Sequence, residues 1–87
     1  MKQIVVLNRS WNIIGDVERD GDFYKINNSA VIRRWGTTAG LGQLANEGPL
    51  PETILDWNHD EIEAHYSQVI FTLKCNPEKW EKVSASK

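Results

Sequence analysis

The sequence predicts an α+β domain built mostly on antiparallel β structure. Short segments in which apolar and polar residues alternate recur along the chain, separated by turn-forming residues. One helical pattern lies in mid-chain, and a second, short one begins at a proline near the end. Six or seven short strands in 87 residues indicate a small curled sheet or an open SH3-like barrel. We expect one domain over residues 1–83 and a frayed tail over residues 84–87.

Apolar, often β-branched residues mark the expected strands, which cover residues 4–7, 13–18, 23–27, 30–35, 53–57, 61–65 and 68–75. Asp20-Gly21 is the strongest turn signal, because glycine takes the positive φ that a tight hairpin needs. Residues 27–29 and 58–60 are expected to form two further turns. In the last strand, alternation predicts that every second residue from Val69 to Leu73 lies on one face.

Two short helices are expected, over residues 39–46 and 77–83. Thr37 or Thr38 can cap the first helix, and Gly48 is a natural place for it to end. In the second helix, Asn76 is a suitable cap and Pro77 fits the first turn. The architecture is therefore a sheet with one short central helix and one short C-terminal helix.

The charged residues are segregated along the chain. The formal net charge is −2, from ten basic and twelve acidic residues. Residues 23–46 contain Lys25, Arg33 and Arg34 but no acid, whereas residues 47–73 contain six acids and no lysine or arginine. This pattern predicts a local positive pocket for a small anion, and it argues against long nucleic acid, which needs a broad basic face. The alternative is that folding brings the acids beside the arginines as ordinary salt bridges.

Several classes of protein are excluded or disfavoured by composition. A single cysteine, Cys75, cannot form an internal disulfide or a cysteine zinc site. The longest apolar run covers only residues 4–7, so we expect no membrane-spanning segment and no membrane partner. We also predict no metal centre and no cofactor, and the chain is expected in the cytoplasm.

The segment over residues 32–45 carries the most chemistry. A strand ends in Arg-Trp, a glycine turn follows, and then come two hydroxyl side chains and a glycine-containing helix start. Unpaired N–H groups at a helix start, hydroxyl groups and arginine forks all suit phosphate, and tryptophan can stack on a base. The candidate ligand-binding residues are Arg33, Arg34, Trp35, Gly36, Thr37, Thr38, Gly40 and Gln43. Strand alternation places Arg33 and Arg34 on opposite faces, so at most one of them lines any given pocket.

The spacing of this segment matches neither a P-loop nor the dinucleotide-binding glycine motif. Packing alone is the alternative explanation: Thr38 caps the helix and Trp35 belongs to the core. That explanation accounts poorly for Gly40 and Gly42, since glycine early in a helix costs about 1 kcal/mol relative to alanine. We therefore expect the protein's own strand, a second subunit or a ligand to approach closely there.

The same segment, IRRWGTTAGLGQLA, together with Gly48-Pro49 and residues 53–56, resembles the central signature of a family of small uncharacterised bacteriophage proteins. The likeness extends over nearly the whole chain, with a specific centre and looser flanks. The resemblance implies a phage setting, and it implies no catalytic residues.

The function expected from these observations is that of a non-enzymatic phage accessory protein, acting against host defences. By analogy with unrelated phage proteins of this size, it would bind and sequester a nucleotide-like, phosphate-bearing immune signal in the host cytoplasm. We expect a small homo-oligomer with the site between subunits, because one 87-residue subunit offers little depth for a pocket.

Two alternatives stay open. One is an anti-CRISPR-like inhibitor that masks a host defence nuclease or effector with acidic residues, namely Glu47, Glu52, Asp56, Asp60, Glu61 and Glu63. The other is a structural protein of the virion. Trp57 is expected to be the most exposed aromatic residue and is a candidate interface residue, while Trp11 and Trp80 are expected to cover the core or contact another subunit. Catalysis has the least support, since no credible nucleophile or acid–base pair emerges.

Overall fold

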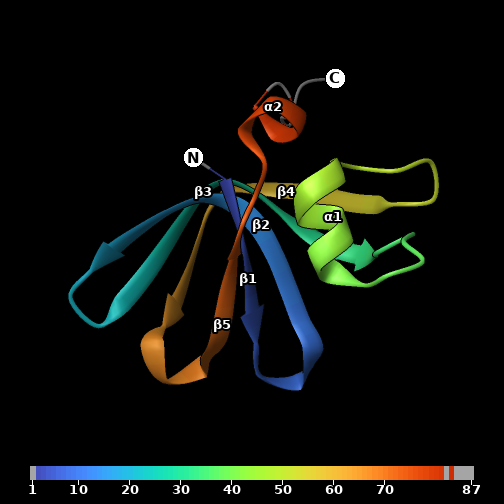
Figure 1. Cartoon of the computed structure of the whole chain (residues 1–87). Coiled ribbons are helices and arrows are strands. Elements are labelled where there is room, and N and C mark those ends of the chain that lie inside the picture. The colour runs from blue at the N-terminus through green and yellow to red at the C-terminus, as the bar shows by residue number, and fades with distance from the viewer. Residues whose placement is uncertain (1, 82, 84–87) are drawn as a thin grey trace.

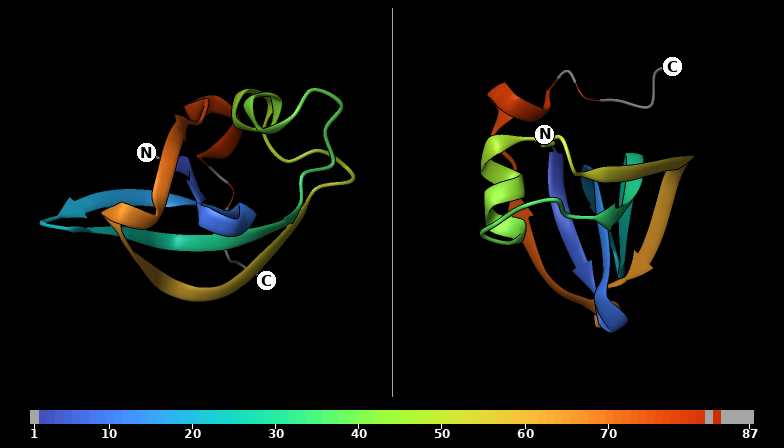
Figure 2. Two further views of the ribbon diagram at one scale, coloured as in Figure 1. Left: turned by 90° about the horizontal axis from the view of Figure 1, so that it is seen from below. Right: turned by 90° about the vertical axis from the view of Figure 1, so that its right-hand side faces the viewer.

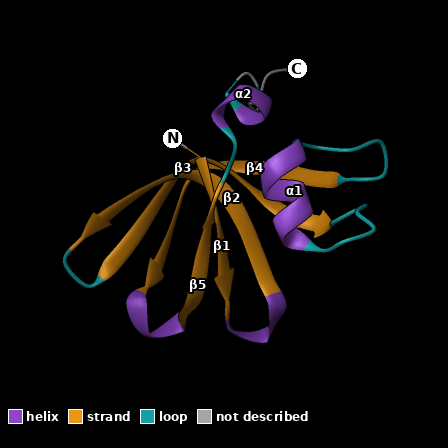
Figure 3. Cartoon of the chain, viewed as in Figure 1, coloured by secondary structure: helices purple, strands orange, loops and turns teal. Residues whose placement is uncertain are grey.

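Most of the chain forms a single antiparallel sheet (Figures 1 and 3). A computed structural model of the protein describes residues 2–81 and 83, with the side chains of residues 58–60 left out. The strands are β1 (Lys2–Leu7), β2 (Trp11–Asp20), β3 (Phe23–Arg34), β4 (Ile54–His65) and β5 (Val69–Lys74), and the helices are α1 (Leu41–Glu47) and α2 (Pro77–Trp80). Short 3₁₀ turns, η1 (Asn8–Ser10) and η2 (Tyr66–Gln68), link β1 to β2 and β4 to β5. The predicted α+β class and the curled, open sheet are confirmed. The expected tail over residues 84–87 lies outside the described residues.

The sheet has the strand order β4-β3-β2-β1-β5, so β4 and β5 are its two edges. These edges follow each other in the sequence with only the three residues of η2 between them. The sheet must therefore curl, and β4 and β5 converge toward η2 (Figure 2, right). Two hydrogen bonds hold this end together: Asn8 Nδ2 donates to Gln68 Oε1 over 3.0 Å, and the Tyr66 N–H donates to the Asp22 carbonyl over 2.8 Å.

Two expected turns are absent because the strands continue through them, and both turn predictions were wrong. Residues 27–29 lie inside β3, and residues 58–60 lie inside β4. In β3, Asn28 takes a φ of 49°, and the register with β2 shifts between Ile14 and Asp16. The pairing of β3 with β4 shifts between Ser29 and Val31. Asparagine tolerates the left-handed region, so the turn-forming residues produce bulges in long bent strands instead of reversals.

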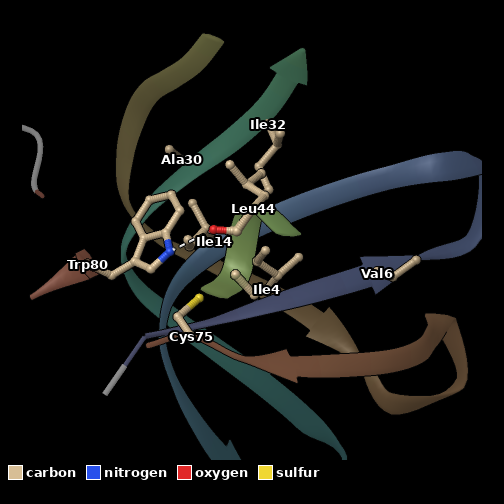
Figure 4. Close-up of a cluster of buried hydrophobic side chains, with 9 residues drawn as sticks. Ile4, Val6, Ile14, Ala30, Ile32, Leu44, Cys75 and Trp80 are labelled. Carbon is tan, nitrogen blue, oxygen red and sulfur yellow. Dashed lines mark hydrogen bonds between the residues drawn. The ribbon is translucent and has the colours of Figure 1, made fainter. Parts of the chain in front are cut away.

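Hydrophobic side chains form one cluster on each face of the sheet, because successive residues of a strand point to opposite faces. The larger cluster lies under α1 and α2 (Figure 4) and consists of Ile4, Val6, Ile14, Ala30, Ile32, Leu44, Ala45, Cys75 and Trp80. Trp80 is fully buried, and its indole N–H donates to the Leu44 carbonyl over 3.0 Å. The smaller cluster, on the other face, is formed by Val5, Ile13 and Ile26. Trp80, which was expected to cover the core or contact another subunit, is itself a member of this core cluster.

The strand β5 changes face along its length. Leu7 pairs with Val69 and Val6 pairs with Phe71, which leaves Ile70 as the extra residue of a bulge. Val69 therefore packs against the smaller cluster while Leu73 packs against the larger one. The expectation of one shared face from Val69 to Leu73 was wrong, because a one-residue bulge inverts the alternation.

Candidate functional site

Arg33, the first of the two arginines predicted to bind a ligand, forms an ion pair with a carboxylate. In the β3–β4 pairing, Ile32 faces Leu55 and Arg34 faces Ile54, so Arg33 is an extra residue of β3. Such bulges redirect side chains. The Arg33 fork meets Asp56 in a two-pronged ion pair, with Nε 3.0 Å from Oδ2 and Nη2 3.1 Å from Oδ1. Both side chains keep solvent exposure, and the pair fixes the guanidinium plane.

The second arginine, Arg34, lies apart from Arg33 and has its own acidic partner. Its Nη2 is 3.5 Å from Glu52 Oε1, in an exposed ion pair. Both arginines of the acid-free segment are therefore matched by carboxylates of the acidic segment. The structure thus shows the salt-bridge alternative to an open positive pocket for these two side chains. Exposed pairs of this kind contribute about 0–1 kcal/mol to stability.

Trp35 and Gly36, in the connection between β3 and α1, contact the segment that precedes β4. The Trp35 carbonyl accepts a hydrogen bond from Thr53 Oγ1 over 2.6 Å, and 41% of the Trp35 residue is exposed. Gly36 has a φ of 69°, and any side chain there would collide with the backbone of Glu52 and Thr53. Glycine at this position is therefore needed by the protein's own packing.

The residues predicted to orient a phosphate are hydrogen-bonded to one another. The Thr38 and Ala39 N–H groups both donate to Gln43 Oε1, over 3.0 and 2.7 Å. The Gly40 N–H donates to Thr37 Oγ1 over 3.1 Å. A ligand at this loop would have to displace the Gln43 side chain from these donors. The predicted site at Thr37–Gln43 stays a prediction.

Gly40 and Gly42 face open space. A Cβ atom at either position would meet no atom within 4 Å. The protein's own strand does not approach there, so the first of the three explanations for these glycines is wrong. Gly40 is nevertheless needed as the N-cap of α1, because its φ is 90°.

A cleft of about 490 Å³ lies beside the start of β2 and is lined in part by Arg33. We call it the Trp11 cleft, and its lining residues are Arg9, Ser10, Trp11, Asn12, Val31, Ile32, Arg33 and Asp56. Trp11 is 56% exposed at the cleft. Its volume is within the range of small-molecule sites. Of the predicted ligand-binding residues, only Arg33 lines this cleft.

The wall formed by η1 has an unusual backbone. Arg9 and Ser10 have φ values of 66° and 65°, so two consecutive non-glycine residues lie in the left-handed region. This conformation costs about 1–2 kcal/mol per residue relative to the right-handed one. Such strain is concentrated at functional sites, where surrounding structure holds it in place. The sequence carried one signal of it: the β1–β2 connection lacks the glycine that a tight hairpin usually has.

The charges at the Trp11 cleft favour an anion. Arg9 and Arg33 line it together with one carboxylate, that of Asp56. Asp56 is already bound by Arg33, and Arg9 has no ion pair with any described residue. A second hollow of about 430 Å³ is lined, among the described residues, by one cation, Lys2, and two acids, Asp16 and Glu81. The Trp11 cleft is therefore the better candidate for a phosphate-bearing ligand.

Three of the six residues of the acidic-inhibitor alternative have a basic partner, and the alternative stays a prediction. Arg34 binds Glu52, Arg33 binds Asp56, and Lys25 lies 3.9 Å from Glu63. Glu47 accepts a hydrogen bond from Gln43 over 3.3 Å, while the Asp60 side chain lies outside the described part. Across the described residues, no three histidine, cysteine or acidic side chains are grouped so that they could hold a metal ion.

Trp57 is half-buried and packs against the larger cluster. The expectation that it is the most exposed aromatic residue was wrong, because β4 continues through the expected turn and keeps the ring on the sheet. Trp11 is the most exposed tryptophan of the described residues. A role for Trp57 at an interface stays a prediction.

No protein-family model matches the chain, and a search of curated proteins gives no match either. None of the described helices has the length and apolar character required to cross a bilayer.

Proposed function

We propose that the protein is a non-catalytic binding protein for a phosphate-bearing, nucleotide-like molecule, and that this ligand occupies the Trp11 cleft. The observation that carries the proposal is the presence of two arginines and an exposed indole around one cleft of about 490 Å³. Arginine supplies charge-assisted hydrogen bonds to phosphate oxygens, and an exposed indole offers a stacking surface for a base.

Arg33 and Arg9 have different parts in this proposal. Asp56 holds Nε and Nη2 of Arg33, so the side chain is oriented before the ligand arrives and loses little freedom on binding. The remaining N–H groups of Arg33 would contact phosphate, as would the fork of Arg9, which has no ion pair with a described residue. Trp11 would stack on the base, while Val31 and Ile32 give the cleft an apolar wall.

In the phage setting implied by the resemblance, such binding would have a role in counteracting host defence. A protein that holds a nucleotide immune signal without converting it would act as a sponge in the host cytoplasm. The absence of conversion is itself testable. Ligand recovered after prolonged incubation with the protein should have an unchanged chromatographic retention time and mass, and a new product would contradict the non-catalytic role.

Binding is tested by calorimetric titration with cyclic dinucleotides, ADP-ribose-type nucleotides, mononucleotides and inorganic phosphate. For any nucleotide that binds, Arg33→Gln should weaken affinity by about 10- to 100-fold, because a charge-assisted hydrogen bond contributes about 1.5–3 kcal/mol. Trp11→Leu should weaken it by about 5- to 100-fold, since stacking contributes about 1–3 kcal/mol per base.

The neighbouring pair of residues supplies matched controls. Arg34→Gln removes an equivalent ion pair outside the cleft, and Trp35→Leu removes another exposed indole. Both variants should bind like the wild type. Loss of binding in these two variants but not in Arg33→Gln and Trp11→Leu would place the ligand at the Thr37–Gln43 loop instead. Absence of heat with every nucleotide in the panel would contradict the proposed function.

A further inference from the structure

Five planar side chains form a continuous stack at the tip of the β2–β3 hairpin, at the opposite end of β2 from Trp11. The Arg19 guanidinium carbon lies 4.7 Å from the Tyr24 ring centre and 5.6 Å from the Tyr66 ring centre. His65 continues the stack, 4.8 Å from Tyr66, and Phe23 meets the His65 ring edge-on at 5.3 Å. The stack joins two strands that are distant in the sequence, because Phe23 of β3 pairs with His65 of β4.

Much of this stack is open to solvent. Phe23 is 43% exposed and Tyr66 is 50% exposed, although the stack holds both rings in place. Exposed aromatic side chains next to an arginine have the composition of the energetically dominant residues of protein interfaces. Rings that are already ordered lose little entropy when a partner covers them.

Arg19 is held in position without a carboxylate. Its Nε donates to the Gly21 carbonyl over 3.0 Å, and its Nη1 lies 3.4 Å from Tyr24 Oη. Among the described residues Arg19 has no ion pair, whereas Lys25, Arg33 and Arg34 each have an acidic partner. The guanidinium is therefore oriented and keeps N–H groups available.

Asp22 is the complementary feature on the same surface. It is exposed in the hairpin turn, and the Tyr66 N–H fixes its main-chain carbonyl over 2.8 Å. Its carboxylate has no ion pair with a described residue, because the nearby Lys25 is bound to Asp20 over 3.1 Å. One oriented cation and one exposed anion thus lie beside the aromatic stack, and neither neutralises the other.

We propose that a second copy of this chain covers this surface, which we call the hairpin face: Arg19, Asp22, Phe23, Tyr24, His65 and Tyr66. In a twofold dimer the same patch meets itself, so each cation must find its anion on the other copy. Arg19 of each copy binds Asp22 of the other, and Phe23 and Tyr66 are buried between them. The charge pattern of the hairpin face is self-complementary, which favours a second copy over an unrelated partner. This inference is independent of the ligand in the Trp11 cleft.

The experiment is a charge exchange, with the mass in solution measured by light scattering and sedimentation over a wide concentration range. The wild type should rise from 10.0 kDa toward twice that mass as its concentration increases. Arg19→Asp and Asp22→Arg each place like charges opposite one another, so each should weaken the dimer by at least about tenfold. The double exchange, Arg19→Asp with Asp22→Arg, should restore it.

Mixing the two single variants gives the sharpest readout. Arg19→Asp alone and Asp22→Arg alone repel themselves, but an equimolar mixture places opposite charges at both contacts and should form a heterodimer. Circular dichroism of each variant checks that the fold is retained, and Tyr66→Ser offers an uncharged route to a monomer if a charge variant unfolds. A wild type that stays at 10.0 kDa at every concentration would overturn the proposal. So would a failure of both the double exchange and the mixture to associate.

Discussion

The two faces of the sheet differ in how they are closed. One face is covered by α1 and α2, and its cluster includes fully buried Ile4, Ile14, Leu44 and Trp80. Among the described residues, the cluster on the other face has three buried members, and none of them comes from an α-helix. The Trp11 cleft is lined from both clusters, by Val31, which packs against the smaller one, and by Ile32 of the larger one.

This difference indicates that the residues that stabilise the fold and the residues of the proposed binding site are largely different. A chain of this size can bury only one substantial core, and here that core lies under the helices. The Trp11 cleft, a strained turn and an exposed indole lie outside the interior of this core, although Ile32 of the larger cluster is one of the cleft's lining residues. These features contribute little to stability. The following predictions test this division, beginning with the largest expected effect.

The largest effect is expected from truncating one tryptophan on each side. Trp80→Ala should lower the free energy of unfolding by about 3–5 kcal/mol, because it empties a fully buried site and removes a hydrogen bond to the Leu44 carbonyl. Trp11→Ala should change it by less than about 0.5 kcal/mol, as expected for an exposed side chain. Urea unfolding of both variants measures the two values. Equal losses in the two variants would show that exposed Trp11 contributes as much to the free energy of unfolding as buried Trp80.

An intermediate effect is expected from two glycines of the segment that bears α1. Gly36→Ala should destabilise by about 2–4 kcal/mol, because it adds left-handed strain and a collision with the Glu52–Thr53 backbone. Gly42→Ala should stabilise by about 0.5–1 kcal/mol, since its Cβ meets open space in a helix. Thermal denaturation compares them. Loss of stability in Gly42→Ala would indicate that another surface, such as a second subunit, approaches there.

An effect confined to alkaline pH is expected from titrating Cys75, which lies under the helices. Burial raises the pKa of this thiol from 9.0 to about 11, although the nearby Lys2 ammonium partly opposes the shift. The raised pKa contributes stability below pH 9.0, and this contribution should be lost as the pH rises through about 11. Unfolding measured across that range checks the slope, with Cys75→Ala as the control that should not show it.

The same thiol should also react slowly. Below both pKa values, Cys75 has about 100-fold less thiolate than an ordinary cysteine, and it is buried. A Ser10→Cys, Cys75→Ala protein carries its thiol at the cleft and should be alkylated faster. Equal alkylation rates of the two thiols would contradict the burial of Cys75 under the helices.

Local signals in the sequence were sufficient for much of the fold. The glycine after Asp20 marks the β2–β3 hairpin, and the Asn76 side chain caps α2 as predicted, accepting from the Glu78 N–H over 3.0 Å. Gly48 ends α1 with a φ of 83°. These features depend on neighbouring residues alone, so they can be predicted without the tertiary structure.

The features that the sequence analysis predicted wrongly or missed depend on pairing between distant segments. Whether residues 27–29 reverse the chain or form a bulge is decided by β2 and β4 on either side of β3. The Trp11 cleft joins the start of β2, the end of β3 and the start of β4, and its ion pair joins Arg33 to a residue 23 positions away. The predicted segment contained Arg33, but its charge neighbours could not be assigned from spacing.

The position of β1 between β2 and the edge strand β5 has a consequence for how the protein is made. Among the strands of this sheet, β1 is synthesised before the others, and one of its two edges is covered only by β5, which is synthesised after them. Translation proceeds at about 5–20 residues per second, so the Ile-Val-Val edge of β1 waits several seconds for its second partner. During that time it is a template for pairing with other nascent chains. Slower elongation between β4 and β5 should therefore increase co-translational aggregation.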